Sequence, residues 1–213
     1  MNLIESVHSG YIEERRIRRL TGHLTEVLPK NVSVLDVGCG SGHLAQNINQ
    51  ERADLTFAGI DVLLREKTWM PVRTFDGQSI PFDSASMDVV MFVDVLHHAD
   101  DPMPLLREAV RVAKKSVIIK DHLLEGVFAE STLRFMDHIG NARYSVALPG
   151  NYWRRRDWEQ AFMTLGMNPV EWREQLGLYP AILDLFFGRS LHFVAKLDVS
   201  KRHDVDGDAG IVR

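Results

Sequence analysis

The feature that most constrains the fold of this chain is a glycine cluster directly after a short apolar run. Between Val34 and Ala45 the sequence is VLDVGCGSGHLA, so β-branched residues lead into three glycines and then into helix-forming residues. Glycine tolerates positive φ angles and lets a ligand approach the backbone without meeting a Cβ. A strand, a glycine turn and a helix in this order predict an α/β fold that binds a ligand at the carboxyl end of its sheet.

Strands and helices are expected to alternate along the rest of the chain. Apolar residues at helical spacing over residues 11–28 predict an N-terminal helix. Its charged side chains, including Arg16, are expected to face solvent; the alternative is a basic contact for an acidic substrate or a membrane surface. Apolar or β-branched runs predict strands at residues 32–37, 55–60, 72–75, 88–95, 116–119, 170–173 and 191–197. Helices are expected over residues 42–50 (with Ser41 as the cap), 102–113 and 155–166. This alternation predicts a mostly parallel sheet with helices on both faces.

Length and composition indicate one domain. The chain has 213 residues, of which 45% are hydrophobic and 25% charged, as in an ordinary globular protein. We expect a single domain over residues 1–199, with an N-terminal helix within residues 1–30 and an insertion or lid at residues 122–153. Residues 200–213 are polar and are expected to form a disordered tail.

Charge and cysteine content limit the setting and the partners. The net charge of -4 gives no sign of a general polyanion binder, so no nucleic-acid partner is expected. No apolar run approaches 18 residues, and no membrane span is expected. Cys39 is the only cysteine, which excludes an internal disulfide and agrees with a cytoplasmic location. The choice between monomer and homodimer stays open.

The residues around the glycines narrow the class of ligand. A nucleoside triphosphate loop needs Lys-Ser/Thr after its last glycine, whereas His43 and Leu44 follow here. A dinucleotide loop of the form G-x-G-x-x-G needs a third glycine where His43 stands, and Gly42 comes one residue early. An NAD-type dehydrogenase therefore remains only as an alternative.

The motif VLDVGCGSG resembles the first motif of class I S-adenosylmethionine-dependent methyltransferases. The stretch from Ile80 to Pro102, IPFDSASMDVVMFVDVLHHADDP, is similar to the fourth-strand region of the type 11-like branch, which modifies small molecules. The resemblance covers about residues 30–121. It implies a single Rossmann-like doubly wound sheet, mostly parallel with a late antiparallel strand, in the order 3-2-1-4-5-7-6. It also implies S-adenosylmethionine as the cofactor and S-adenosylhomocysteine as its product.

The resemblance assigns cofactor-binding roles to particular residues. It implies that Asp61 binds the ribose hydroxyls and that Asp76 binds the adenine amino group, because a carboxylate accepts hydrogen bonds from both. The alternatives are that Asp61 and Asp76 are plain turn residues and that Asp36 only ties down the loop. Cys39 is expected to pack rather than to react. The expected cofactor-binding residues are Asp36, Gly38, Cys39, Gly40, Gly42, Asp61, Val62, Asp76, Gly77 and Asp94.

Methyl transfer from a sulfonium chiefly requires an acceptor held in line with the methyl group, so proximity is the main catalytic effect expected. A general base is needed only where the acceptor holds a proton, and His97, His98 and His122 are the candidates. The alternatives are that His97 packs against the cofactor and that His98 caps a helix or faces solvent. No metal is expected, because adjacent histidines rarely converge on one ion without distant ligands.

The acceptor pocket is expected in the aromatic-rich region from Phe128 to Arg189. This composition predicts a small, partly hydrophobic acceptor, and plain core packing is the alternative for each aromatic residue. DNA methyltransferase chemistry is not expected, because the fourth strand is followed by neither an Asn/Asp-Pro-Pro-aromatic motif nor a cysteine. A protein that binds the cofactor without transferring a methyl group is the alternative function. The candidate substrate-binding residues are His97, Tyr144, Tyr152 and Trp153.

Overall fold

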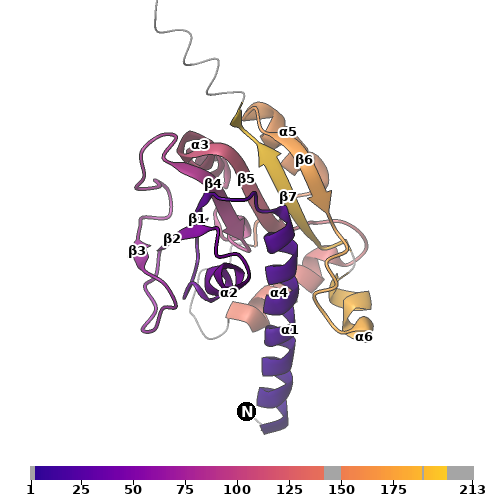
Figure 1. Ribbon diagram of the computed structural model, residues 1–213. Helices are drawn as coiled ribbons and strands as arrows, with labels where there is room; N and C mark the ends of the chain where they lie inside the picture. Colours follow the sequence, from indigo (N-terminus) through magenta and orange to yellow (C-terminus); the bar gives the residue numbers. More distant parts are fainter. Residues whose placement is uncertain (1–2, 142–149, 189, 201–213) are drawn as a thin grey trace, which may run out of the picture.

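The computed structural model describes residues 3–141, 150–188 and 190–200, and at its centre lies a seven-stranded sheet (Figure 1). The strand order is β3-β2-β1-β4-β5-β7-β6. Only β7 runs antiparallel to its neighbours, β5 and β6; the other pairs are parallel. The strand order and the late antiparallel strand are therefore confirmed. The strands are β1 Ser33–Val37, β2 Thr56–Asp61, β3 Val72–Thr74, β4 Met87–Val93, β5 Ala113–His122, β6 Asn168–Arg173 and β7 His192–Asp198.

Helices occupy the expected intervals, with some differences in length. The α-helices are α1 Leu3–Val27, α2 His43–Glu51, α3 Met103–Val112, α4 Ala129–Asn141, α5 Arg155–Thr164 and the short α6 Ala181–Leu183. A 3-10 turn, η1, spans Leu96–His98, and a π-helical turn, η2, spans Asp184–Gly188. Helix α1 begins well before residue 11, and Figure 1 shows its first turns extending beyond the sheet. Across the described ranges, no helix is long and apolar enough to cross a membrane.

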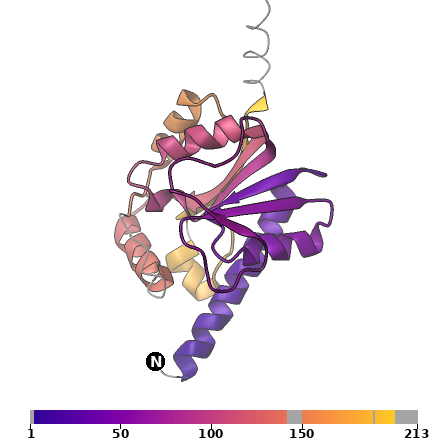
Figure 2. The ribbon, with the colours of Figure 1, turned by 90° about the vertical axis from the view of Figure 1, so that its left-hand side faces the viewer.

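The alternation of side chains along the strands produces two apolar layers. On β1, Val34 packs with α1 and α2 on one face of the sheet, whereas Leu35 packs with α3 and α5 on the other. The same alternation continues on β4, where Met91 and Phe92 lie on opposite faces. Figure 2 shows the helices on the two sides of the sheet. All four of these side chains are fully buried. The sequences of these strands are therefore continuous apolar runs, as is typical of parallel strands covered on both faces.

Two local expectations were wrong. Strand β5 does not stop at residue 119 but continues to His122, because it pairs with β7 along its length, up to His122 opposite His192. Ser41 does not cap α2: Gly42 stands at the N-cap position with φ 76°, and no side chain caps this helix. The left-handed conformation of Gly42 places the turn one residue later than expected.

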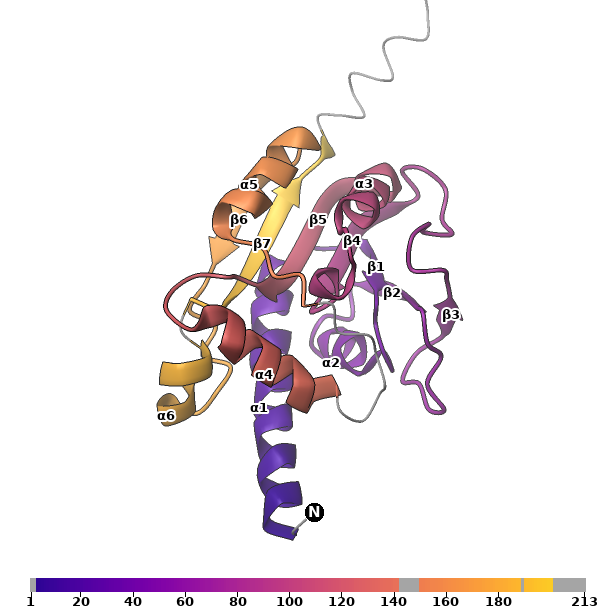
Figure 3. The same ribbon diagram turned by 180° about the vertical axis from the view of Figure 1, so that it is seen from behind.

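Helices α4 and α6 and the first half of α1 lie beyond one end of the sheet (Figures 2 and 3). This is the end of the sheet at which β4 and β5 finish. Helix α4 fills the middle of the segment 122–153, whose role as an insertion or lid stays a prediction, as does the domain boundary at residue 199. Residues 201–213 of the expected tail lie outside the described ranges. The carboxyl end of the sheet is thus covered by elements that can enclose a ligand.

Candidate functional site

The three glycines of the loop between β1 and α2 all have positive φ angles, and their surroundings differ. A Cβ on Gly38 would lie 2.5 Å from Cγ2 of Val95, and one on Gly42 would lie 2.5 Å from Cγ of Met70. A Cβ on Gly40 would meet nothing within 4 Å. Packing therefore requires glycine at the first and third positions, and the middle position leaves open space for a ligand to approach the backbone.

Asp61, at the end of β2, holds this loop in place. Its Oδ2 accepts a hydrogen bond from the Gly40 amide at 2.8 Å, and its Oδ1 accepts one from the Leu63 amide at 2.9 Å. The side chain is buried, with 6% exposed. A carboxylate has about four acceptor positions, so each oxygen keeps capacity for a ribose hydroxyl. Asp61 is therefore both a structural clamp and a candidate ribose ligand.

Asp36 is a buried carboxylate without a compensating donor. It is 3% exposed, and within the described ranges its side chain makes no hydrogen bond. Burial, and then the nearby charge of Asp61, raises the pKa of Asp36 to about 7. The alternative that Asp36 ties down the loop is therefore wrong. An uncompensated buried carboxylate favours a cationic ligand group, such as an ammonium.

Three further residues expected at the cofactor lie on the rim beside Asp61. The Oδ1 of Asp76 accepts hydrogen bonds from two following backbone amides, at 2.8 and 2.7 Å, which lower its pKa and form a tight turn. A Cβ on the adjacent Gly77 would lie 3.1 Å from Cγ1 of Val62. Asp76 is thus a turn residue, as in the alternative interpretation, and its exposed carboxylate also remains available to an adenine amino group.

Residues between β2 and β3 cross the glycine loop, which the sequence did not predict. The Trp69 amide donates a hydrogen bond to the Ser41 carbonyl at 2.8 Å, and the His43 ring stacks on Trp69 with centroids 4.9 Å apart. Cys39 packs inside this layer, close to Gly59. Burial raises the pKa of the Cys39 thiol, so the thiol stays protonated and is a poor nucleophile, in agreement with a packing role.

A cavity of about 270 Å³ adjoins the glycine loop at the ends of β4 and β5. Asp94 contributes its side chain to the cavity, and the next residue, Val95, packs against Gly38. The cavity therefore lies beside the expected cofactor position. Its lining residues are Glu13, Arg16, Ile17, Leu20, Asp94, His97, His98, His122, Met136, Asp137 and Tyr179.

Asp94 is held by two cations. Its backbone is left-handed, with φ 56°, and its carboxylate pairs with Arg16 of α1 at 2.5 Å and with the fully buried Lys120 of β5. Burial opposes the ionisation of Asp94, but Lys120 and Arg16 outweigh it and hold its pKa well below the usual value. The expectation that Arg16 faces solvent was wrong, because α1 crosses the carboxyl end of the sheet and directs this side chain inward.

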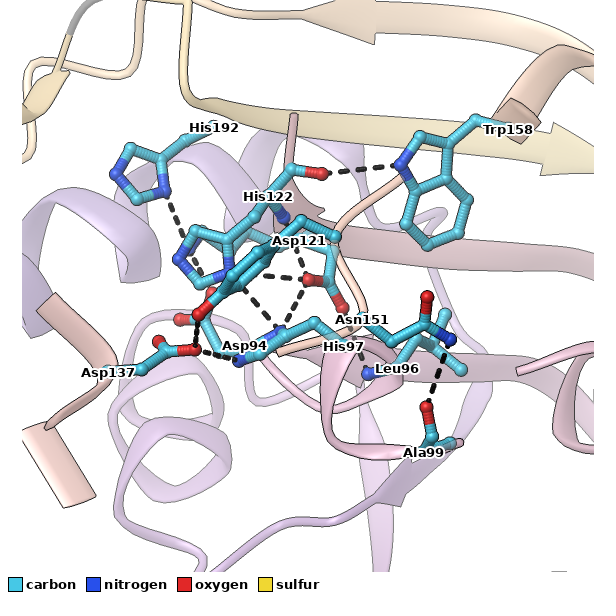
Figure 4. Close-up of polar contacts among 12 residues, drawn as sticks. Asp94, Leu96, His97, Ala99, Asp121, His122, Asp137, Asn151, Trp158 and His192 are labelled. Carbon is cyan, nitrogen blue, oxygen red and sulfur yellow. Dashed lines mark hydrogen bonds and ion pairs between the residues drawn. The ribbon is translucent and has the colours of Figure 1, made fainter. Parts of the chain in front are cut away.

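His97 lies between two carboxylates (Figure 4). Its Nδ1 is 2.6 Å from Oδ1 of Asp121, and its Nε2 is 3.4 Å from Oδ2 of Asp137. Asp121 is fixed because its other oxygen accepts a hydrogen bond from the Leu96 amide at 2.9 Å. Burial lowers the pKa of His97, but the two carboxylates, Asp121 first, outweigh it and raise the pKa to about 10. His97 is therefore an imidazolium at neutral pH.

The other two candidate histidines also line the cavity, but in different states. Burial, and then the charge of His97, lowers the pKa of His98 to about 4. The Nδ1 of His98 is buried and has no hydrogen-bond partner in the described part of the chain. Burial also lowers the pKa of His122, whose Nδ1 lies 3.2 Å from Nδ1 of His97. The structure thus brings all three candidate bases together and leaves two of them uncharged.

The expected substrate-binding residues have separate locations. Tyr152 is buried next to the cavity and donates a hydrogen bond from its hydroxyl to Asp137 at 2.5 Å. Trp153 does not line the cavity; its ring packs against Trp158 in the core, with centroids 4.9 Å apart. Tyr144 lies outside the described residues. Of the aromatic-rich region, Met136 and Tyr179 line the cavity.

Two sets of side chains in the described ranges bring metal-ligating atoms within 4.8 Å of one another: Asp94, His122 and His192, and His97, Asp121 and His122. In the first set, the Lys120 ammonium lies between Asp94 and His192, where it takes the place of an ion. In the second set, the Nδ1 of His97 contacts Oδ1 of Asp121 at 2.6 Å and Nδ1 of His122 at 3.2 Å. The absence of a metal stays a prediction from the sequence.

Several residues in or next to the cavity were not among the expected site residues. Glu13, Arg16 and Asp137 line the cavity, and Lys120 and His192 lie next to its lining residue Asp94. Lys120 had a usable signal, because it interrupts the apolar run SVIIK of a buried strand, where a charge must have a partner. Asp137 had none, because it lies on an ordinary amphipathic helix and reaches the site only through the placement of α4.

A family model described as a methyltransferase domain matches residues 35–119. Over 131 residues the chain is 28% identical to 27-O-demethylrifamycin SV methyltransferase of Amycolatopsis mediterranei (strain S699), in a match that covers 52% of this chain and 48% of the relative. The chain thus spans about half the length of the curated relatives it matches. Residues 35–119 include the glycine loop, Asp61 and those residues after β4 that line the cavity.

Solved structures share the fold. A SAM-dependent methyltransferase from Aquifex aeolicus superimposes with a TM-score of 0.54 at 18% identity, covering 84% of this chain and 88% of that chain. Geranyl diphosphate C-methyltransferase from Streptomyces coelicolor A3(2), in complex with Mg²⁺, geranyl diphosphate and S-adenosyl-L-homocysteine, gives a TM-score of 0.62 at 12% identity, covering 84% and 79%. The family match and the acidic residues around the glycine loop support a class I S-adenosylmethionine-dependent methyltransferase, with S-adenosylmethionine as its cofactor.

Proposed function

We propose that this protein transfers the methyl group of S-adenosylmethionine to a small, partly hydrophobic molecule bound in the cavity beside the glycine loop. The continuity between the two sites carries the proposal: Asp94 lines the cavity, while the adjoining Val95 packs on Gly38. A cavity of about 270 Å³ is close to the lower end of small-molecule sites. The lining combines apolar side chains with histidines and carboxylates, which suits an acceptor with both characters. The apolar side chains are those of Ile17, Leu20 and Met136.

The cofactor supplies an electrophilic methyl group. The protein has to fix the position of the methyl group and of the acceptor. We expect Asp36 to bind the ammonium and Asp61 to bind the ribose, in keeping with their burial beside the glycine loop. The cavity then holds the acceptor against the glycine loop, so proximity and orientation are the main source of rate. His97, His98 and His122 line the cavity and are the residues expected to contact the acceptor. We expect this reaction to take place in the cytoplasm, in keeping with the single cysteine, Cys39.

The test is methyl transfer from radiolabelled S-adenosylmethionine to fractions of a metabolite extract. We expect label in a small-molecule fraction, with one S-adenosylhomocysteine formed for each methyl transferred. Asp61→Asn should reduce this turnover through weaker cofactor binding. If S-adenosylmethionine binds tightly and no S-adenosylhomocysteine forms with any fraction, the transferase proposal is wrong, and a cofactor-binding partner protein without turnover is favoured instead.

A further inference from the structure

The two carboxylates beside His97 are at unequal distances, and the difference is informative. The Nδ1 contact with Asp121, at 2.6 Å, is a short charge-assisted hydrogen bond. The Nε2 contact with Asp137, at 3.4 Å, is longer than the 2.7–3.2 Å of an ordinary N–H···O bond. The contact between His97 and Asp137 is therefore loose, and a ligand atom in the cavity can also bind to the Asp137 carboxylate.

Asp137 is held in place and charged. It lies on α4, is 7% exposed, lines the cavity and accepts the 2.5 Å hydrogen bond from the Tyr152 hydroxyl. Burial raises the pKa of Asp137, but the contact with His97 and the charge of His97 outweigh burial and lower the pKa. Asp137 is therefore an anionic carboxylate at neutral pH. A carboxylate offers about four acceptor positions, so a ligand hydroxyl can also donate to it.

The charges of the cavity favour a neutral acceptor. Arg16 and Lys120 pair with Asp94, and the imidazolium of His97 lies between Asp121 and Asp137. Glu13 also lines the cavity, but it is exposed to solvent. Because the charges around Asp94 and His97 are already paired with one another, a charged acceptor would enter beside them without a counter-ion of its own, and an ammonium would also meet the cations around it. A neutral hydroxyl has no such cost, and it carries the proton that a carboxylate can accept.

We propose that the methyl acceptor is a hydroxyl group, of an alcohol or a phenol, which donates a hydrogen bond to Asp137, and that Asp137 is the catalytic base. This inference rests on the proposed function. The acceptor oxygen forms a bond to the methyl carbon while the bond from that carbon to sulfur breaks, and its electron pair stays on sulfur. The hydroxyl proton moves to the Asp137 carboxylate, and the product is a methyl ether. A base helps here because a neutral hydroxyl keeps its proton until it is methylated.

The three histidines are less suited to this step. His97 already carries both ring protons, so it orients Asp137 rather than taking a proton. The Nδ1 of His98 is buried, and the Nδ1 of His122 faces His97. Tyr152 is a second positioning residue, because its hydroxyl fixes one oxygen of Asp137.

The pH profile of methyl transfer distinguishes Asp137 from His97 as the base. If Asp137 is the base and His97 must stay protonated, the rate should be level around neutrality and fall as the pH passes the pKa of His97, about 10. If His97 were the base, the rate would rise toward that pH, which would overturn the proposal. The titratable groups that face His97 are Asp121 and His122 from β5, Asp94 after β4, Asp137 from α4, His98 from η1 and Tyr152 before α5.

The chemical class of the acceptor can be read directly from the product. The full-length protein is incubated with S-adenosylmethionine labelled with ¹³C in the methyl group and with a metabolite extract, and the transferred methyl is observed by ¹H–¹³C NMR. We expect a methoxy signal that survives mild alkali, as an ether does and an ester does not. An N-, S- or C-methyl signal, or an ester, would overturn this inference and leave the transferase proposal standing. No transfer at all, with the cofactor bound, would overturn both.

Substitutions then test Asp137 itself in the same assay. Asp137→Asn keeps the shape of the side chain and should reduce the rate of methyl transfer roughly 10²–10⁴-fold, with an unchanged Kd for S-adenosylmethionine. Glu130→Gln is the matched control, because Glu130 lies on the same helix, is exposed and pairs only with Arg134 at 3.0 Å among the described residues. Its rate should be that of the wild type, and an equal loss in both variants would overturn the assignment.

Tyr152→Phe provides a second route that does not change the charge of α4. It removes one hydrogen bond to a charged group and should reduce the rate roughly ten- to a hundredfold, again with unchanged cofactor affinity. It remains informative if Asp137→Asn fails to fold. A wild-type rate in Tyr152→Phe would show that the position of Asp137 does not matter, which contradicts the proposal.

Discussion

Gly38 and Gly40 are both left-handed glycines of one loop, yet they should respond differently to the same substitution. In Gly38→Ala, the new Cβ would lie 2.5 and 2.9 Å from the two Cγ atoms of Val95. The left-handed conformation costs an alanine about 1–2 kcal/mol, and the overpacking against Val95 adds about 1–3 kcal/mol. The free energy of unfolding should therefore fall by about 2–5 kcal/mol.

Gly40→Ala is the matched control. Its φ of 58° carries the same backbone cost, but a Cβ would meet nothing within 4 Å. The loss in the free energy of unfolding should be only about 1–2 kcal/mol. The added methyl group would occupy the space through which the cofactor approaches the backbone. The affinity for S-adenosylmethionine should therefore fall by more than in a variant that loses the same stability at a site away from this loop.

Thermal unfolding and calorimetric titration with S-adenosylmethionine provide the two readouts. For a chain of this length, the expected losses correspond to about 4–20 °C in Tm for Gly38→Ala and about 2–8 °C for Gly40→Ala. Adding Val95→Ala to Gly38→Ala relieves the overpacking and should narrow the gap between the two alanine variants. Equal Tm losses in both single variants, or a larger loss in Gly40→Ala, would refute the packing argument.

Further predictions concern three side chains, of which Asp36 and Lys120 are buried and Trp153 is partly buried. The pKa of Asp36 is raised to about 7, so in the cofactor-free protein its carboxyl is protonated below that pH. The affinity for S-adenosylmethionine should therefore fall about tenfold for each pH unit below pH 7. Calorimetry should show that Asp36→Asn abolishes this pH dependence. The same raised pKa means that Asp36 binds its proton more tightly in the folded chain, so its contribution to stability declines as the pH rises from about 4 to about 7. Asp36→Asn should consequently raise the Tm of the cofactor-free protein at alkaline pH; a lower Tm would contradict this. Lys120→Met leaves Asp94 with Arg16 alone and should lower the free energy of unfolding by about 3–5 kcal/mol in urea titrations. Adding Asp94→Asn should recover part of this loss. No recovery would rule out the Lys120–Asp94 ion pair as the cause. Trp153→Ala should cost at most about 3 kcal/mol of stability and leave the rate of methyl transfer unchanged, because this ring packs in the core; a selective loss of rate would return it to the acceptor site.

Local sequence patterns predicted the frame of this molecule well. The run before Gly38 becomes β1 because its side chains alternate between two buried faces, and Asp61 ends β2 beside the glycine loop, as the family resemblance implies. The start of α1 was harder to place, because its apolar spacing is clear only from about residue 11 onward. The length of β5 depended on its partner β7, far along the chain, so its own apolar run could not reveal its end at His122.

The cavity was predicted less completely because it combines distant segments. Arg16, His97, Asp121 and Asp137 come from four separate elements, and their proximity depends on how α1 and α4 cross the end of the sheet. In the sequence, Arg16 belongs to a charged run that is typical of a solvent-facing surface. Only the position of its helix over Asp94 turns it into a half-buried ion-pair partner. Short-range patterns carry no information about such crossings.

Calorimetric titration of the wild type and of Asp61→Asn with S-adenosylmethionine, and of the wild type with NAD, tests the central claim most directly. The wild type should bind one S-adenosylmethionine per chain and give no heat with NAD. Asp61→Asn should bind S-adenosylmethionine at least about tenfold more weakly, which corresponds to the loss of one hydrogen bond to a charged group. Binding of NAD alone, or unchanged affinity in Asp61→Asn, would contradict the assignment of the glycine loop and Asp61 to S-adenosylmethionine.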